Sequence, residues 1–217
     1  MQIAFLLYDR FAALDVVGPF EVFANMPGID TVLVAEQPGP VNNENGACQL
    51  VAQAALEDVT APDIVVVPGG TPPPSLLTHE PILDWLREVH GRTQLTTSVC
   101  TGALLLGAAG LLDGVRATTH WAARDKLADL GADVVAERVV TEGKIVTAAG
   151  VSAGIDMAFT VLARTHGDAA AQAVQLGLEY DPQPPFDSGA KEKAFADTVA
   201  LVTAVLEARA AEVAQAA

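Results

Sequence analysis

The amino-acid sequence predicts an α/β fold in which helices cover both faces of a mostly parallel sheet. Short hydrophobic runs without polar alternation recur along the 217 residues, a pattern typical of strands that are buried on both faces. Segments of helical length lie between and after these runs. Regular alternation of the two kinds of segment favours parallel strands that are joined by helical crossovers.

Five buried strands are expected, and in chain order they are Ile3–Tyr8, Thr31–Ala35, Ile64–Val67, Thr96–Val99 and Ile145–Ala148. The expected helices are Val16–Asn25, Glu80–His90, Thr101–Leu111, Ala122–Leu130, Ala153–Thr165, Asp168–Leu178 and Lys191–Ala211. Residues 139–147 predict a hairpin that turns at Glu142 and Gly143 and adds a small antiparallel element to the sheet.

Length and composition narrow the possible classes of protein. The chain is long enough for one domain, 1–217, with a substantial core, and no apolar stretch approaches the roughly 20 residues of a membrane helix. A net charge of −15 argues against nucleic acid or an anionic membrane as a partner. The first residues resemble a strand and not a signal peptide, so we expect a cytoplasmic protein.

Two cysteines are too few for a disulfide framework or a zinc site, so no metal is expected. No phosphate-binding glycine motif occurs either. Cys48 is most simply interpreted as a buried strand residue.

Cys100 stands where a β-prone run passes directly into a helix-prone one. Such a junction predicts a sharp strand-to-helix elbow that holds the sulfur clear of the backbone. The helix start would present N–H groups and a positive dipole end to the sulfur and favour the reactive thiolate. The alternative is a small buried cysteine at the end of a strand. Thr101 and Gly102, which follow directly, favour a nucleophile.

A glycine loop follows another expected strand. Gly69 and Gly70 permit close approach of the backbone, and their N–H groups, together with that of Thr101, could form an anion-binding pocket opposite the sulfur. Since the carboxyl ends of parallel strands meet at one edge of a sheet, the loop and Cys100 are expected to form one site. A plain strand-terminating turn is the alternative.

Two carboxyl groups compete for the role of acid and base. Asp15 precedes an expected helix, where it could be a simple N-cap. Alternatively, a carboxyl beside the Cys100 thiolate would share one proton with the sulfur and could move that proton during turnover. Glu21 lies further along the same helix and would face another direction.

Other polar residues have more ordinary explanations. His120 could act as a base for Cys100, but a histidine beside a tryptophan is more often a packed residue. Ser152 is expected to cap a helix. Two proline-rich loops, Pro68–Ser75 and Tyr180–Gly189, are suited to lining a site or an interface.

Several segments together resemble the ThiJ/PfpI superfamily, and they are Leu14–Phe23, Val67–Gly70, Ser98–Ala103, Ala117–Trp121 and Tyr180–Phe186. The resemblance covers nearly the whole chain and implies a flavodoxin-like three-layer sandwich with a cysteine nucleophile elbow. Protease-like members carry histidine after the cysteine, where this chain has Thr101. Another branch uses glutamate as the acidic partner, where this chain has Asp15. Regulators that share the Ala117–Trp121 pattern continue into a helix-turn-helix domain, for which we expect no residues here.

The pattern is most similar to the isocyanide hydratase branch of the superfamily. This resemblance implies a cofactor-free enzyme on a small-molecule substrate, with Cys100 as nucleophile, Asp15 as acid and base and Thr101 in support. It also implies a homodimer. Two alternatives stay open: a glyoxalase- or deglycase-like enzyme acting on 2-oxoaldehydes, and a redox sensor in which Cys100 is oxidised.

Overall fold

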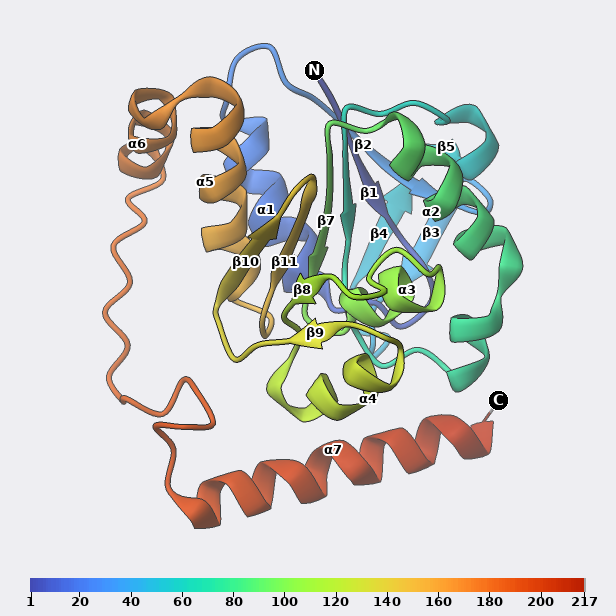
Figure 1. Ribbon diagram of the computed structural model, residues 1–217, viewed down its shortest axis with the longest axis vertical. Coiled ribbons are helices and arrows are strands. Elements are labelled where there is room, and N and C mark those ends of the chain that lie inside the picture. Colours follow the sequence, from blue (N-terminus) through green and yellow to red (C-terminus); the bar gives the residue numbers. More distant parts are fainter. Residues whose placement is uncertain (217) are drawn as a thin grey trace.

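The computed structural model describes residues 1–216 and contains a seven-stranded sheet with helices on both faces (Figure 1). The strand order is β10-β11-β7-β6-β1-β2-β5, and every pairing is parallel except that of β10 with β11. This arrangement confirms the predicted α/β fold class.

The strands of this sheet are β1 (Gln2–Leu6), β2 (Asp30–Ala35), β5 (Ala54–Ala55), β6 (Ile64–Val67), β7 (Leu95–Val99), β10 (Val139–Glu142) and β11 (Ile145–Ala148). The helices are α1 (Ala13–Ala24), α2 (Glu80–Arg92), α3 (Gly102–Ala108), α4 (Arg124–Asp129), α5 (Ala153–His166), α6 (Asp168–Gly177) and α7 (Ala196–Ala216). The short 3₁₀ helices are η1 (Leu56–Asp58), η2 (Pro74–Thr78) and η3 (Trp121–Ala123).

The centre of the sheet is apolar on both faces. All four residues of β6 are fully buried, as are the last four residues of β1. Helices α1 and α5 pack together on one face, and α2 and α3 cover the other (Figure 1). Two glycines allow this close packing, because a Cβ at Gly18 would lie 2.9 Å from the Ile155 side chain, and one at Gly154 would lie 3.1 Å from the Pro19 ring of α1 and 3.0 Å from Val99 of β7. This packing fixes α1, which carries Asp15, against the strand that ends at Cys100.

Two small strand pairs were not predicted. Strands β3 (Gly39–Asn42) and β4 (Gln49–Ala52) form an antiparallel hairpin, and β8 (Arg116–Ala117) pairs in parallel with β9 (Asp133–Val134). They are short and mostly exposed or half-buried, so they lack the continuous apolar run that identifies the central strands.

The prediction for Cys48 was wrong. This cysteine is exposed and lies before β4, where its N–H donates to Oδ1 of Asn43 at 3.1 Å. The apolar Leu50 and Val51 that suggested a buried strand belong to the hairpin, which stands outside the main sheet.

The C-terminal part of the chain leaves the sandwich. An exposed segment from Asp181 onward leads to α7, which begins at Ala196 and not at the expected Lys191 because residues 191–194 form a turn. Figure 1 shows α7 (red) crossing the end of the molecule at which α3 begins, below α4.

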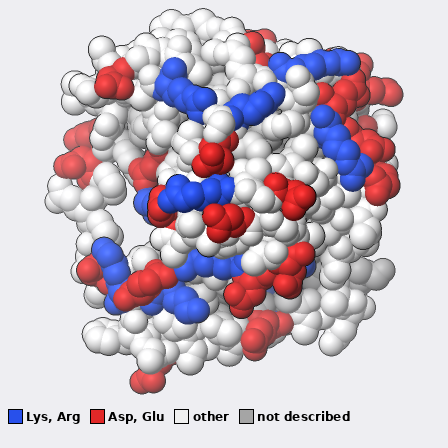
Figure 2. Space-filling model, viewed as in Figure 1, with Lys and Arg blue, Asp and Glu red and all other residues white. Residues whose placement is uncertain are grey.

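Acidic and basic side chains are intermingled on the face drawn in Figure 2. Many of the basic residues form ion pairs, among them Arg87 with Glu80 and Asp84, and Arg116 with Glu137. Among residues 1–216, no helix combines the length and apolar character that crossing a membrane requires.

Candidate active site

Cys100 lies on a strained elbow between β7 and α3. Its φ angle is +56°, in the left-handed region that non-glycine residues seldom adopt. The Cys100 N–H donates to the carbonyl of Ala149 at 2.7 Å, and its own carbonyl accepts from the Thr119 hydroxyl at 2.7 Å. A Cβ at Gly102 would lie 2.2 Å from the carbonyl oxygen of Val67, so only glycine lets the elbow approach β6 this closely. The tertiary contacts therefore hold the strained cysteine in place.

Asp15 does not cap its helix. It lies inside the first turn of α1, whose N-cap is Ala12, and it is fully buried. Its Oδ2 accepts a hydrogen bond of 2.8 Å from the N–H of Gly69, while Oδ1 is buried and has no partner within residues 1–216. Burial, and to a lesser extent the carboxylate of Glu44, raise the pKa of Asp15 to about 7, although the Gly69 hydrogen bond opposes the change.

The glycine loop joins the two candidate catalytic residues. A Cβ at Gly69 would lie 2.5 Å from the backbone nitrogen of Thr101 and 2.8 Å from the Cβ of Cys100. The next residue, Gly70, donates its N–H to the Thr101 hydroxyl at 2.9 Å, and that hydroxyl lies 3.0 Å from the Gly70 carbonyl. The two loop N–H groups expected to form an anion pocket are thus occupied by Asp15 and by Thr101.

The electrostatics of Cys100 differ from the expectation for a helix start. Burial and the nearby Asp15 carboxylate raise the pKa of the Cys100 thiol, and they outweigh hydrogen bonds from Thr101 and Val151 that lower it. Because the pKa values of Asp15 and Cys100 are both raised, the pair retains a proton at neutral pH. Attack by the sulfur therefore requires that the thiol proton leave Cys100, and the Asp15 carboxylate is the nearby base whose charge raises the pKa of that thiol.

Two further residues belong to this electrostatic cluster and were missed by sequence reasoning. Tyr8 is buried and donates its hydroxyl to the Pro68 carbonyl at 2.6 Å. Burial raises the pKa of Tyr8, and so do Asp15, Cys100 and Glu44. Tyr8 could have been found from its place just after β1, at the carboxyl edge of the sheet. Glu44 gave no such signal, because it reaches the site from the tip of the unpredicted β3–β4 hairpin, where its N–H donates to the Phe11 carbonyl at 2.9 Å.

The other candidates from the sequence make no side-chain hydrogen bond to Asp15 or Cys100 within residues 1–216. The Nδ1 of His120 accepts from the N–H of Ala122 at 3.3 Å, and its ring packs 5.5 Å from that of Trp121. Glu21 is exposed on α1. Ser152 occupies the N-cap position of α5 but makes no capping hydrogen bond through its side chain. His120 is therefore a packed residue, as the simpler interpretation of the sequence held.

Two cavities flank Tyr8. The smaller, of about 230 Å³, adjoins the elbow through Gly70 and Thr101. It is lined by Tyr8, Gly70, Thr71, Pro72, Pro73, Pro74, Leu77, Thr101, Leu104, Leu105, Lys126, Ala210 and Val213. Of the two proline-rich loops that could line a site, Pro68–Ser75 contributes to this cavity and Tyr180–Gly189 does not.

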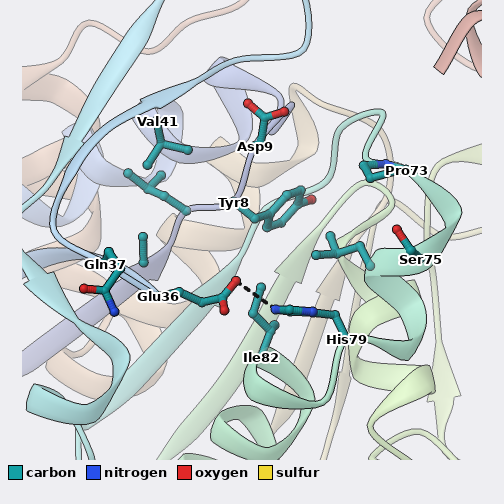
Figure 3. A pocket seen from close by; sticks show the side chains of 12 residues that line it. Tyr8, Asp9, Glu36, Gln37, Val41, Pro73, Ser75, His79 and Ile82 are labelled. Atoms are coloured by element: carbon teal, nitrogen blue, oxygen red, sulfur yellow. Dashed lines mark hydrogen bonds and ion pairs between the residues drawn. The ribbon is translucent and has the colours of Figure 1, made fainter. Parts of the chain in front are cut away.

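The larger hollow, of about 510 Å³, lies at the ends of β1 and β2. Figure 3 shows the Tyr8 ring extending toward Pro73 and Ser75 in this hollow, and His79 paired with Glu36 at 2.8 Å. Neither this hollow nor the smaller cavity has Cys100 or Asp15 in its lining, but the smaller one contains Thr101, the residue next to Cys100. Across residues 1–216, no three His, Cys, Asp or Glu side chains gather in a way that could hold a metal ion.

Comparison with known proteins relates this geometry to a family. Residues 1–164 match the model of the DJ-1/PfpI family. An isonitrile hydratase from Pseudomonas putida is 45% identical over 194 residues, which are 89% of this chain and 85% of that protein. The crystal structure of a ThiJ/PfpI family protein from Pseudomonas syringae superposes with a TM-score of 0.90 at 33% identity, over 99% of this chain and 89% of that one. A more distant relative, a deglycase from Pyrococcus abyssi, is 25% identical over 149 residues, 68% of this chain and 89% of that protein.

Proposed function

Because this chain belongs to the DJ-1/PfpI family, we propose that it is an isocyanide hydratase, which adds water to R–N≡C and releases the formamide R–NH–CHO. The main support is the buried Asp15, whose pKa is raised to about 7 and whose Oδ1 has no partner within residues 1–216. The loop residue Gly69, which donates a hydrogen bond to Asp15, also lies against Cys100. The similarity to the Pseudomonas putida isonitrile hydratase supports the choice of substrate class.

In the first step, the Cys100 thiolate attacks the terminal carbon of the isocyanide while Asp15 is protonated. A bond forms between sulfur and carbon, and the Asp15 proton passes to that carbon. The product is a thioimidate, R–N=CH–S–Cys, and Asp15 is left as a carboxylate. A carboxyl with a pKa near 7 suits this transfer because it holds a proton at neutral pH and releases it readily.

In the second step, the Asp15 carboxylate takes a proton from water as the water oxygen bonds to the thioimidate carbon. Asp15 passes this proton to the nitrogen, which gives R–NH–CH(OH)–S–Cys. The remaining hydroxyl proton then moves to Asp15 as the carbon–sulfur bond breaks. These transfers release R–NH–CHO and restore the Cys100 thiolate and protonated Asp15. Cys100 and Asp15 supply every step, so we propose no metal or organic cofactor.

The remaining site residues position these two groups. Gly69 orients the carboxyl of Asp15 through its N–H, which leaves Oδ1 as the oxygen that carries the proton. Thr101 hydrogen-bonds the sulfur and is itself held by Gly70. Loss of the Thr101 hydroxyl would free the Gly70 N–H and loosen the elbow.

We also propose a cytoplasmic homodimer. Helix α7 has an exposed apolar face in which Leu201 is 66% exposed and is joined by Val202 and Val205. The segment before it carries Phe186 and Phe195, which are 77% and 81% exposed. Large apolar patches on a single chain mark surfaces that another protein covers, and a second copy of this chain supplies the same surface.

The proposal is tested by mixing the purified, reduced protein with cyclohexyl isocyanide and following formamide formation. Parallel samples contain Cys100→Ala and Asp15→Asn. We expect turnover by the wild type and loss of turnover in both variants. Formation of lactate from methylglyoxal without isocyanide turnover would instead favour the glyoxalase- or deglycase-like alternative. The similarity to the Pyrococcus abyssi deglycase supports that alternative. Peroxide-dependent partner binding without any turnover would favour the redox sensor.

A further inference from the structure

Helix α7 contacts the sandwich through few side chains, and one of them is buried. Val213 is 6% exposed, while its neighbours Glu212 and Ala214 are exposed, as are Leu201 and Val205 earlier in the helix. The burial of this single valine near the end of an exposed helix identifies the point at which α7 meets the body of the protein. That point is the 230 Å³ cavity, which Val213 and Ala210 help to line.

The beginning of α7 is held by separate contacts. Just before the helix, Glu192 forms an ion pair of 2.7 Å with Arg124, whose side chain is 22% exposed. Lys191 places its ammonium group 5.5 Å from the centre of the Trp121 ring. The helix of 21 residues that follows spans roughly 32 Å. Contacts at both ends therefore hold α7 across the end of the molecule at which α3 begins (Figure 1).

The same cavity contains the residues next to the proposed nucleophile. Gly70 and Thr101 line it, and Thr101 directly follows Cys100 and hydrogen-bonds its sulfur. A molecule in this cavity is thus bounded by the elbow and by α7. Resting on the proposed hydratase function, we propose that α7 forms a wall of the substrate cavity and limits the enzyme to isocyanides with a small apolar R group.

The chemistry of the lining specifies this substrate class. Prolines and leucines from the loop after β6, from η2 and from α3 predominate, and they are Pro72, Pro73, Pro74, Leu77, Leu104 and Leu105. Lys126 is the charged residue of the lining and is exposed to solvent. Pockets for drug-sized ligands measure about 300–1,000 Å³, so a cavity of about 230 Å³ suits a smaller molecule.

The test compares small and large isocyanides in variants of the wall. Val213→Phe narrows the cavity and Val213→Ala widens it, while Ala211→Phe adds the same ring at an exposed position about 200° around the helix. We expect Val213→Phe to lower kcat/KM for cyclohexyl isocyanide by roughly 10- to 200-fold, relative to methyl isocyanide. Val213→Ala should shift the same ratio in favour of the larger substrate, and Ala211→Phe should leave it at the wild-type value.

A second readout does not depend on hydration. In a Cys48→Ser background, the rates of Cys100 alkylation by N-methylmaleimide and N-cyclohexylmaleimide report the size limit of the cavity directly. We expect Val213→Phe to slow the larger reagent selectively. Equal size dependence in Val213→Phe, Val213→Ala and wild type, in both assays, would overturn the role of α7. Size-dependent alkylation without isocyanide turnover would support the wall and contradict the proposed reaction.

Discussion

The N–H of Gly69 donates a hydrogen bond of 2.8 Å to Oδ2 of Asp15, and this bond joins the loop after β6 to the first turn of α1. One carboxyl oxygen is thereby fixed by the backbone, and the other is buried without a partner in the part of the chain that the structure describes. The bond directs the acid function of Asp15 toward its free oxygen. It also opposes the effect of burial on the pKa, which would be higher without it.

The first prediction concerns the space at Gly69. An added Cβ would lie 2.5 Å from the Thr101 nitrogen, a contact that requires the loop or the elbow to move. We expect Gly69→Ala to remove most activity and to lower the free energy of unfolding by about 1–3 kcal/mol, measured by urea denaturation. Gly91→Ala is the control, because a Cβ there meets nothing within 4 Å and the change favours helix α2. Equal activity in both variants would contradict the prediction.

The second prediction follows from the raised pKa of Asp15. The folded protein holds this proton up to about pH 7, whereas the unfolded chain releases it near pH 3.8. The folded state therefore binds more protons between these values, and the free energy of unfolding falls as the pH rises through this range. Asp15→Asn has no such titration. We expect the free energy of unfolding of the variant, relative to that of the wild type, to increase by about 2–4 kcal/mol as the pH rises from 4 to 8. Urea denaturation at each pH measures this difference. A constant difference would show that the Asp15 pKa is not raised.

The third prediction tests the part played by Glu44. Its carboxylate contributes to raising the pKa of Asp15. Replacing Glu44 with glutamine removes that charge, so the pKa of Asp15 should fall. The pH profile of kcat/KM should then lose activity at a lower pH on its alkaline side. Glu57→Gln, an exposed acid of η1, is the control and should leave the profile in place. If Glu57→Gln shifts the pH profile and Glu44→Gln does not, Glu44 does not tune the pKa of Asp15.

The fourth prediction addresses the strain at the elbow. Cys100 has a φ angle of +56°, which glycine adopts at no steric cost while alanine does not. Both substitutions remove the thiol, but Cys100→Gly also relieves the backbone. We expect Cys100→Gly to be about 1 kcal/mol more stable than Cys100→Ala in urea denaturation. A more stable alanine variant would indicate that the elbow is not strained.

The elements with uninterrupted apolar runs could be predicted from the sequence. The residues of β6 and β11 are hydrophobic or β-branched at almost every position, and burial on both faces follows from that composition alone. The elbow at Cys100 could be anticipated for a similar reason, since the change from strand to helix and the glycine at position 102 are both local signals. The resemblance of these segments to a known family is confirmed by the match over residues 1–164.

The electrostatic state of the site depends on contacts between distant segments and could not be predicted. The sequence left Asp15 either as an N-cap or as an acid that shares a proton with Cys100, and burial under the loop at Gly69 decides for an acid with a pKa near 7. The same burial raises the pKa of Cys100, against the expectation from a helix start, because the loss of water around a charge outweighs a few hydrogen bonds.

The lining of the cavity depends in the same way on chain segments that are far apart in sequence. Val213 lies more than a hundred residues after Cys100 in the chain and reaches the cavity from α7. Local patterns determine which segments become strands and helices, since hydrogen bonding and burial of a single segment suffice for that. The pKa values and the shape of the cavity arise only where segments meet, because desolvation and exclusion of water depend on every neighbour that the fold brings together.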